Sequence, residues 1–277
     1  MAEAFHNSPR TVNSVNRIWR VAKSLPLPLA LEPGELHVWQ AALATDPRAN
    51  CAKSDLLSRS ERRRAAQFTR PVDRERNAAK WVILRSLLAS YLGTCPRDIE
   101  ISRTEHGKPH LLAENTIKIS LSSSGDIAAF VISNGLEVGV DIEQVRHLPD
   151  SQDIADRFFA PLEKQNLSDV APERREREFF RYWVCKEALL KATGKGLYAP
   201  LDYFSLGTAS DGAMEIASVD GDQSNVKNWW LEDFSVAVKS VGAVAANGVP
   251  RAVRYLIWDE SAQLSVCSDQ PSQVEFA

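Results

Sequence analysis

The sequence contains no apolar run approaching the roughly 20 residues that a membrane-spanning helix needs. Its first stretch, MAEAFHNSPRTVNSVNR, also lacks the apolar core of a secretory signal. We therefore expect no membrane contact and a cytoplasmic location. Cysteine is scarce: the four cysteines form no CxxC pair, which predicts reduced thiols and argues against a zinc site.

The chain also has no strong charge of either sign, since its formal net charge is −3. This slight acidity argues against nucleic-acid binding, although residues 59–76 hold seven arginines against three acids. That run is either a solvated helix face with internal ion pairs, a nucleic-acid contact, or a helix from which one or two arginines reach a ligand phosphate. The five histidines show no metal or relay spacing, and neither a Gly-x-Ser-x-Gly elbow nor a Cys-His nucleophile pattern is present.

What is present is an ordinary globular composition over 277 residues, with 44% hydrophobic and 25% charged residues. The sequence predicts a loose N-terminal arm over 1–33, two halves over 34–135 and 136–267, and a flexible tail over 268–277. Strands are expected at 36–43, 99–103, 117–121, 127–133 and 136–143, with further short strands over 203–267. Helices are expected at 54–68, 73–92, 151–167 and 173–193, the first capped by Ser58 or Ser60. Because strands and helices alternate without regular βαβ spacing, the pattern favours an α+β fold.

A short internal repeat links the two longest predicted helices. KWVILRSLLASYLG (80–93) and YWVCKEALLKATG (182–194) share Trp-Val, a charged residue four places after the tryptophan, a leucine pair and a closing glycine. Either chance or a duplication explains one short match. A duplication would place two similar halves about a pseudo-two-fold axis, with a site at the interface between them.

Two carboxylates interrupt a strand that otherwise has the composition of a buried one, EVGVDIEQV (137–145). Strand alternation puts Gly139, Asp141 and Glu143 on one face. Such a face is either solvated and paired with a nearby cation, or part of a metal site. A third carboxylate, Glu187, lies in the same helical stripe as Lys191. Three carboxylates without His or Cys suit Mg²⁺, which is often completed by substrate phosphates.

Three loops could supply cations or hydrogen-bond donors to a phosphate. SRTEHGKPHL places Arg103 and Lys108 around a Gly-Lys-Pro turn, and KATGKGL closes a helix, unlike a Walker A loop, which opens one. ISLSSSGD is expected to run from a strand into a serine-rich loop that includes Ser122 and Ser123.

Taken together, GVDIE, WVCKEALLK, the upstream GKP and the serine loop resemble the Sfp-type 4′-phosphopantetheinyl transferases. The resemblance covers about residues 36–240. It implies an α+β fold of two similar halves, and an enzyme that moves the phosphopantetheine arm of coenzyme A (CoA) to a serine of an acyl or peptidyl carrier protein. The other product would be adenosine 3′,5′-bisphosphate.

The resemblance also implies roles for individual residues. Asp141, Glu143 and Glu187 would hold Mg²⁺ against the CoA pyrophosphate. Lys186 and Lys191 would lie near that pyrophosphate. Arg64 and the segment from Arg103 to Lys108 would bind the adenosine bisphosphate end. Either Glu163 or Glu187 would remove the serine proton.

One position departs from the family pattern. The family loop commonly reads N-x-S-H-S, with its histidine near the 3′-phosphate, and Ser123 stands where that histidine would be. A serine cannot carry the charge, so binding of the 3′-phosphate would be weaker or supplied by an arginine. The alternative is therefore that the protein is a relative of these enzymes that binds carrier domains or nucleotides without transferring the phosphopantetheine arm. Which carriers are served is open, and a monomer is expected.

Overall fold

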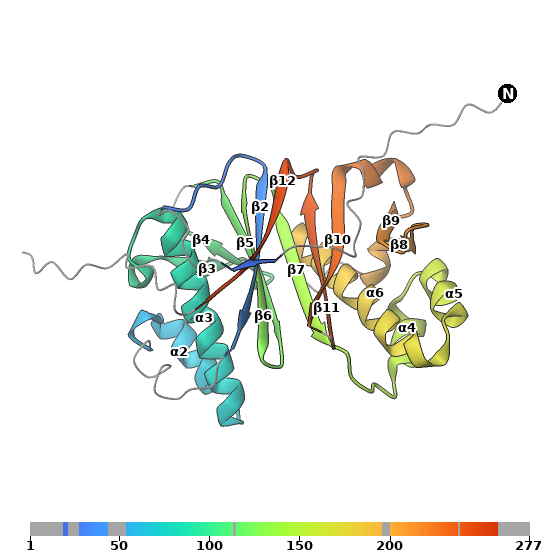
Figure 1. Ribbon diagram of the computed structural model, residues 1–277, viewed down its shortest axis with the longest axis horizontal. Helices are drawn as coiled ribbons and strands as arrows, with labels where there is room; N and C mark the ends of the chain where they lie inside the picture. The colour runs from blue at the N-terminus through green and yellow to red at the C-terminus, as the bar shows by residue number, and fades with distance from the viewer. Residues whose placement is uncertain are drawn as a thin grey trace, which may run out of the picture.

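The structure, a computed structural model, describes residues 19–21, 28–43, 54–112, 115–195, 200–237 and 239–259. Two 22-residue helices dominate it, α3 (Pro71–Leu92) and α6 (Pro172–Thr193). Shorter α-helices are α2 (Arg59–Ala66), α4 (Ser151–Phe158) and α5 (Pro161–Asp169), and 3₁₀ turns include η1 (Ser54–Leu56), η2 (Pro96–Asp98), η4 (Leu201–Tyr203) and η5 (Gln223–Asn228). Figure 1 shows α2 and α3 on one side of the strands, and α4, α5 and α6 on the other.

The strands form two main sheets and two hairpins. The larger sheet has the order β1-β12-β2-β6-β5, and the smaller has the order β10-β11-β7. The hairpins are β3-β4 and β8-β9. The strands are β1 (Arg20–Val21), β2 (Glu35–Ala42), β3 (Ile101–Arg103), β4 (Pro109–Leu111), β5 (Ile117–Ser124), β6 (Ile127–Asn134), β7 (Val138–Gln144), β8 (Phe204–Thr208), β9 (Met214–Val219), β10 (Trp229–Ala237), β11 (Ser240–Asn247) and β12 (Ala252–Ile257). The expected α+β class is confirmed.

The order of elements repeats along the chain. The first series runs β2, α2, α3, the hairpin β3-β4, then β5 and β6; the second runs β7, α4 and α5, α6, the hairpin β8-β9, then β10 and β11. The strand orders correspond as well, because β2-β6-β5 in one sheet matches β7-β11-β10 in the other. Each series therefore places one long helix against one three-stranded unit.

Local signals fix the helix ends. Ser58 rather than Ser60 caps α2, since its hydroxyl accepts from the Glu61 amide and the Glu61 carboxylate accepts from the Ser58 amide. Both long helices begin with proline, one or two residues before the expected starts at 73 and 173. Both end at a left-handed glycine, Gly93 or Gly194, as predicted.

The expectation of a single helix at 151–167 is wrong, because α4 ends at Phe158 and a second helix, α5, begins at Pro161. A proline has no amide hydrogen to donate to the preceding turn, but it is well suited to the first position of a new helix. Glu163 completes the new start by accepting from the Ala160 amide at 2.7 Å.

The serine-rich segment is strand rather than loop, since β5 runs to Ser124 and the turn follows at Gly125. Where β5 of the larger sheet meets β7 of the smaller one, serine hydroxyls of β5 accept hydrogen bonds from backbone amides of β7, in place of backbone carbonyls. Ser120 accepts from the Val140 amide at 3.2 Å, and Ser124 accepts from the Gln144 amide at 3.0 Å. A run of polar residues is stable in this strand because β7 supplies hydrogen-bond partners at every second position.

The carboxylate-bearing face of β7 lies against α6. A Cβ on Gly139 would come within 1.9 Å of the Ala188 carbonyl oxygen and 2.6 Å of the Ala192 amide, so only glycine allows this approach. The opposite face, formed by Val138, Val140 and Ile142, is buried between the sheets, as alternation predicts.

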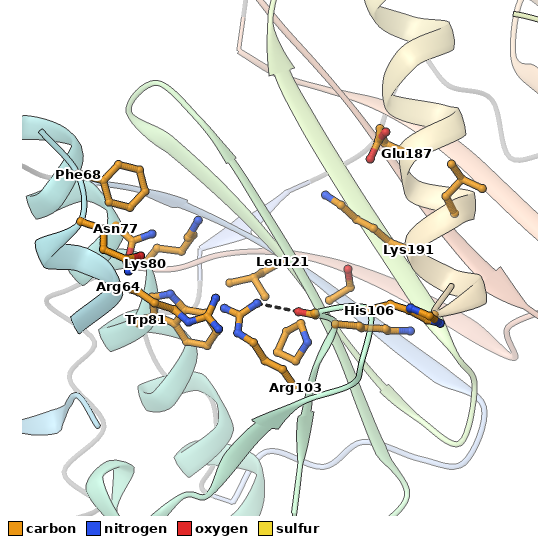
Figure 2. Close-up of a pocket in the computed structure, with 17 residues that line it drawn as sticks. Arg64, Phe68, Asn77, Lys80, Trp81, Arg103, His106, Leu121, Glu187 and Lys191 are labelled. Carbon is orange, nitrogen blue, oxygen red and sulfur yellow. Dashed lines mark hydrogen bonds between the residues drawn. The ribbon is translucent and has the colours of Figure 1, made fainter. Parts of the chain in front are cut away.

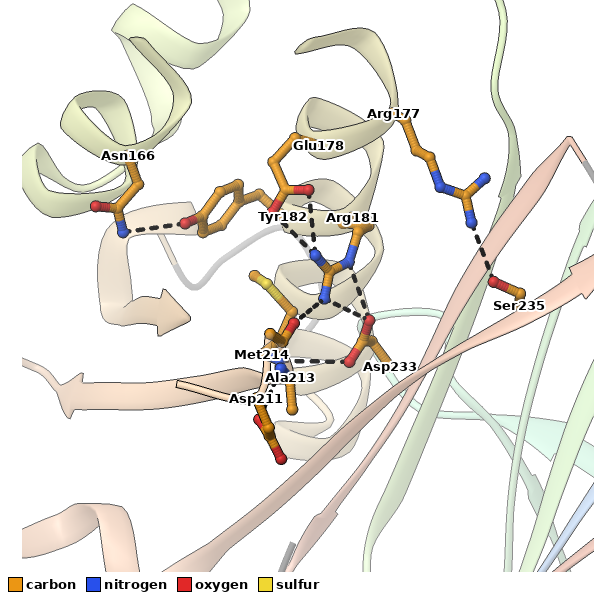
Figure 3. A network of polar contacts seen from close by, with 11 residues as sticks. Asn166, Arg177, Glu178, Arg181, Tyr182, Asp211, Ala213, Met214, Asp233 and Ser235 are labelled. Atoms are coloured by element: carbon orange, nitrogen blue, oxygen red, sulfur yellow. Dashed lines mark hydrogen bonds and ion pairs between the residues drawn. The ribbon is translucent and has the colours of Figure 1, made fainter. Parts of the chain in front are cut away.

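A polar network fixes α6 on its other side (Figure 3). The Arg181 guanidinium donates to Asp233 of β10 at 2.8 Å and to Glu178 at 3.1 Å. Despite the burial of the guanidinium, these two carboxylates raise its pKa, so the ion pair remains charged. The register of α6 against β10 is thereby set, which fixes where its other residues point.

Two further expectations need correction. Within the expected N-terminal arm, Arg20 and Val21 pair with β12 and Leu29 is buried, so these residues belong to the fold. Residues 1–18 and 22–27 of the expected arm, and the expected tail at 268–277, lie outside the described residues. The expectation of reduced thiols is wrong for Cys95, which is disulfide-bonded. Cysteine spacing in the sequence does not reveal which thiols a fold brings together.

Across the described ranges, no helix has the length and apolarity that crossing a membrane requires.

Candidate active site

A cavity of about 530 Å³ opens between the N-terminal helices and α6. Its volume is within the range of small-molecule sites. It is lined by Arg64, Gln67, Phe68, Asn77, Lys80, Trp81, Arg103, His106, Gly107, Lys108, Pro109, Ser120, Leu121, Glu187, Leu190, Lys191 and Gly194. Figure 2 shows Glu187 and Lys191 reaching it from α6, while Arg64, Lys80 and Trp81 face them from α2 and α3.

On the α6 side of the cavity, the ammonium group of Lys191 contacts a carboxylate of β7. Lys191 Nζ lies 2.7 Å from Asp141 Oδ1, and the Ser122 hydroxyl donates to the same oxygen at 2.7 Å. Ser122 is therefore a second hydrogen-bond donor to Asp141, besides Lys191. The neighbouring carboxylate, Glu143, accepts from Ser124 at 2.8 Å and pairs with Arg146 at 3.1 Å.

Glu187 lines the cavity beside these acids. Burial raises the pKa of the Glu187 carboxyl, and the negative charges of Asp141 and Glu143 raise it further. The described residues contain no group of three or more His, Cys, Asp or Glu arranged to hold a metal ion. Asp141, Glu143 and Glu187 nonetheless offer the oxygen donors that Mg²⁺ prefers, and the first two lie near enough to Glu187 for their charges to raise its pKa.

The opposite wall is cationic. An ion pair between Arg85 and Glu61, 2.8 Å long and buried, holds α2 on α3 and so directs Arg64 to the cavity. The guanidinium of Arg103 stacks over the Trp81 ring at 5.1 Å. Burial and the charge of Arg64 lower the pKa of Arg103, as expected where cations are crowded together.

Lys108 lies at the turn of the β3-β4 hairpin, where Gly107 adopts a positive φ of 86°. Its Nζ donates to Glu137 at 2.8 Å. Burial lowers the pKa of Lys108, while the bond to Glu137 acts in the opposite direction. The GKP turn thus brings its lysine to the cavity.

Of the predicted site residues, six are not among those that line the cavity: Asp141, Glu143, Ser122, Ser123, Glu163 and Lys186, the last two being paired with each other in the core. Lys186 is fully buried, with its ammonium 2.7 Å from Glu163 Oε1 and 2.7 Å from the Phe204 carbonyl oxygen. Glu163 is also fully buried and accepts further bonds from the Leu206 and Ala160 amides. Consecutive residues of a helix point about 100° apart, so Lys186 faces α5 and β8 while Glu187 faces the cavity.

Several lining residues were missed by sequence reasoning, Lys80 and Asn77 of α3 and Phe68 among them. A signal existed for Lys80, because it is the charged residue in the otherwise apolar stretch AAKWVIL. A lysine in a buried helix segment needs a reason to be there. Ser123 is absent from the lining, but its hydroxyl oxygen accepts from Lys80 Nζ at 2.9 Å.

The chain matches two family models. Residues 137–243 match the 4′-phosphopantetheinyl transferase superfamily, and residues 45–134 match the N-terminal region of a 4′-phosphopantetheinyl transferase. It is 37% identical over 178 residues to the 4′-phosphopantetheinyl transferase HetI of Nostoc sp. (strain PCC 7120), covering 62% of this chain and 75% of that protein. The 4′-phosphopantetheinyl transferase Sfp of Bacillus subtilis is 32% identical over 166 residues, covering 59% and 72% respectively.

Similarity to solved structures covers a smaller part of the chain. Helicobacter pylori holo-[acyl-carrier-protein] synthase in complex with coenzyme A aligns with a TM-score of 0.31 and 18% identity, covering 39% of this chain and 96% of that one. The enzyme from Thermotoga maritima aligns with a TM-score of 0.33 and 20% identity, covering 41% and 64%.

Proposed function

The chain belongs to the 4′-phosphopantetheinyl transferase superfamily, and we propose that it binds CoA and carries out the transfer in the cavity between α3 and α6. It is an enzyme that moves the phosphopantetheine arm of CoA to a carrier protein. The observation that carries the site assignment is the pairing, in one cavity, of a cationic wall with an acidic wall, where Glu187 lines the cavity and Asp141 lies behind it on Lys191. No observation favours a relative that binds without transfer.

Asp141, Glu143 and Glu187 would hold Mg²⁺. Burial and like charge already disfavour the ionised form of Glu187, and a divalent cation relieves such repulsion. When bound, the ion supplies positive charge to the pyrophosphate oxygens. This chain contributes Lys191, whose ammonium lies at the edge of the cavity and stabilises negative charge on the same group.

Glu187 is the proposed base. The carrier serine oxygen forms a bond to the phosphorus that bears the pantetheine, and the bond from that phosphorus to the oxygen of adenosine 3′,5′-bisphosphate breaks. The serine proton passes to the Glu187 carboxylate. Of the two carboxylates considered for this role, Glu187 lines the cavity, whereas all of Glu163 is buried against Lys186 and backbone amides.

The adenosine bisphosphate end is assigned to the cationic wall. Arg64 and Arg103 line this wall, and Lys108 lies at its rim beside Gly194. Among the arginines of residues 59–76, Arg64 reaches the cavity, which supports the interpretation of that run as a contact with a ligand phosphate.

We also propose that residues 34–135 and 136–267 are two similar halves about a pseudo-two-fold axis, with the site at their interface and with β12 of the second half added to the sheet of the first. The support is the repeated order of elements and the matching strand orders β2-β6-β5 and β7-β11-β10. Since one chain provides both walls, a monomer suffices. Sedimentation at the mass of one chain is expected, and a stable dimer would contradict this.

The test incubates the protein with CoA, Mg²⁺ and an apo acyl or peptidyl carrier protein, then weighs the carrier by mass spectrometry. The carrier should gain one phosphopantetheine arm. Asp141→Ala and Glu187→Gln should each abolish the gain, whereas Glu215→Gln, an exposed position on β9, should leave it unchanged. Full activity of the Asp141 and Glu187 variants would refute the assigned carboxylate roles.

A further inference from the structure

Lys80 is the one lysine of α3, and its side chain projects from an apolar stretch of that helix into the cavity. Its Nζ donates to the hydroxyl oxygen of Ser123 at 2.9 Å. Figure 2 shows Lys80 beside Arg64 and Asn77, on the wall across the cavity from Glu187 and Lys191. The ammonium group is thus held in place at the cationic wall.

The partner of Lys80 does not neutralise its charge. Lys108 and Lys191 each contact a carboxylate, Glu137 and Asp141 respectively, at 2.8 and 2.7 Å. Within the described part of the chain, Lys80 forms no ion pair of this kind. Burial, together with the positive charges of Lys191 and Arg103, lowers the pKa of Lys80 to about 8. A partly buried cation without a carboxylate partner stabilises an anion that enters the cavity.

CoA offers two anionic groups to these walls, the pyrophosphate and the 3′-phosphate. The pyrophosphate is assigned above to the acidic wall, where Lys191 and the proposed metal site would meet it. The cationic wall then faces the 3′-phosphate, a monoester with close to two negative charges. If Arg64 and Arg103 alone bound the 3′-phosphate, the positive charge of Lys80 on the same wall would have no anion to stabilise.

We propose that Lys80, positioned by Ser123, binds the 3′-phosphate of CoA and makes this enzyme prefer CoA to 3′-dephospho-CoA. The inference rests on the proposed function of the cavity. Ser123 acts through Lys80 and is a positioning residue. Strand alternation in β5 separates the two roles of its serines, since Ser122 and Ser124 face β7 whereas Ser123 faces α3.

This arrangement explains how Ser123 can stand where related enzymes commonly have a histidine. A serine supplies a hydrogen-bond acceptor but no positive charge. Lys80, which lies 43 positions earlier in the chain, brings the charge to the same place. A cation from α3 therefore takes over a role that the strand residue cannot fill.

The experiment measures binding of CoA and 3′-dephospho-CoA by calorimetry, with transfer from each donor measured separately by carrier mass. A charge-assisted hydrogen bond is worth about tenfold to a hundredfold in affinity. The wild-type protein should show a preference for CoA of about that size or more. Lys80→Met should reduce the preference by about tenfold or more, and Lys80→Arg should keep most of it.

The matched control is Lys227→Met, an exposed lysine on η5 that does not line this cavity, and it should bind as the wild type does. Ser123→Ala should raise the KM for CoA while leaving kcat, and the KM for 3′-dephospho-CoA, near their wild-type values. A purely structural role of Ser123 would change both donors equally.

An unchanged preference for CoA in Lys80→Met, with wild-type near-ultraviolet dichroism, would overturn the inference. So would an equal loss of affinity for both donors. If the wild-type protein binds CoA but transfers from neither donor, the proposed function fails while the binding ratio still tests Lys80. If it binds neither donor, both fail.

Discussion

Gly139→Ala adds one methyl group at the point where α6 lies on β7. The added Cβ would be 1.9 Å from the Ala188 carbonyl oxygen, 2.6 Å from the Ala192 amide and 2.9 Å from Lys191 Cβ. Two of these atoms belong to the helix backbone, so no side-chain rotation relieves the clash. The helix must retreat by about 1.5 Å to restore the 3.4 Å of an ordinary contact.

The cost is that of an overpacked core at its upper end, about 3 kcal/mol, because backbone opposes the new atom on the helix side. For a chain of this size, that corresponds to a melting temperature lower by about 6 to 12 °C. The same displacement separates Glu187 and Lys191 of α6 from Asp141 of β7. Misplacement by about 1 Å costs catalysis about a hundredfold. Calorimetric melting and transfer measured on the folded fraction give the two effects separately.

Gly207→Ala in β8 is the matched control, since its Cβ would find nothing nearer than Glu215 Oε1 at 3.6 Å. Its stability should stay within about 0.5 kcal/mol of the wild type. If Gly139→Ala melts and transfers like Gly207→Ala, the close packing of α6 on β7 is refuted, together with the positioning of the carboxylates that depends on it.

Three other perturbations have signs that the structure fixes. Glu163→Gln leaves Lys186 buried without its charge partner and should lower the free energy of unfolding in urea by about 3 kcal/mol, while the transfer rate of folded enzyme stays unchanged. A hundredfold loss of that rate would restore Glu163 as the base. Burial lowers the pKa of His37 from 6.5 to about 4, so the unfolded chain gains the proton first as the pH falls. Stability should therefore be lost between pH 6.5 and 4, by about 3 kcal/mol, and His37→Gln should be less acid-sensitive in urea titrations at both pH values. Equal sensitivity would contradict this. Burial also lowers the pKa of Lys80 from 10.5 to about 8, so its charge destabilises the folded state at pH 7, and this cost fades as the pH rises toward 10.5. After discounting for partial exposure, Lys80→Met should raise the melting temperature at pH 7 by about 2 °C or more, even as it weakens CoA binding, and a lower melting temperature would contradict this reasoning.

The parts of the fold that could be predicted from the sequence are those with local causes. Gly93 and Gly194 end the two long helices because a left-handed residue closes each one, and a glycine there is visible in the sequence. The two faces of β7 follow from alternation, which needs only the strand assignment. The same rule placed Asp141 beside Glu143.

The parts that could not be predicted depend on partners distant in the chain. The serines of β5 have the composition of a loop, and only the adjoining β7 accounts for a polar strand. The family resemblance implied that Lys186 lies near the pyrophosphate, but it pairs instead with Glu163, which lies 23 residues earlier. Sequence proximity gives no information on which direction a helical side chain takes until the surrounding elements are placed.

In the motif WVCKEALLK, one charged residue holds the helix in the fold and two others face the cavity, and helix geometry makes this difference necessary. Residues four apart share a face, so Glu187 and Lys191 reach the cavity together, while Lys186 is turned toward α5. The buried pair with Glu163 ties α6 to α5 and β8. Arg181, which precedes Glu187 by about 1.7 turns, ties the same helix to β10. The Glu187 carboxylate and the Lys191 ammonium can be held within reach of a substrate only if their helix neither rotates nor slides, and charged residues on its other faces oppose both movements. The number of charges in this helix is therefore explained by positioning as much as by the reaction.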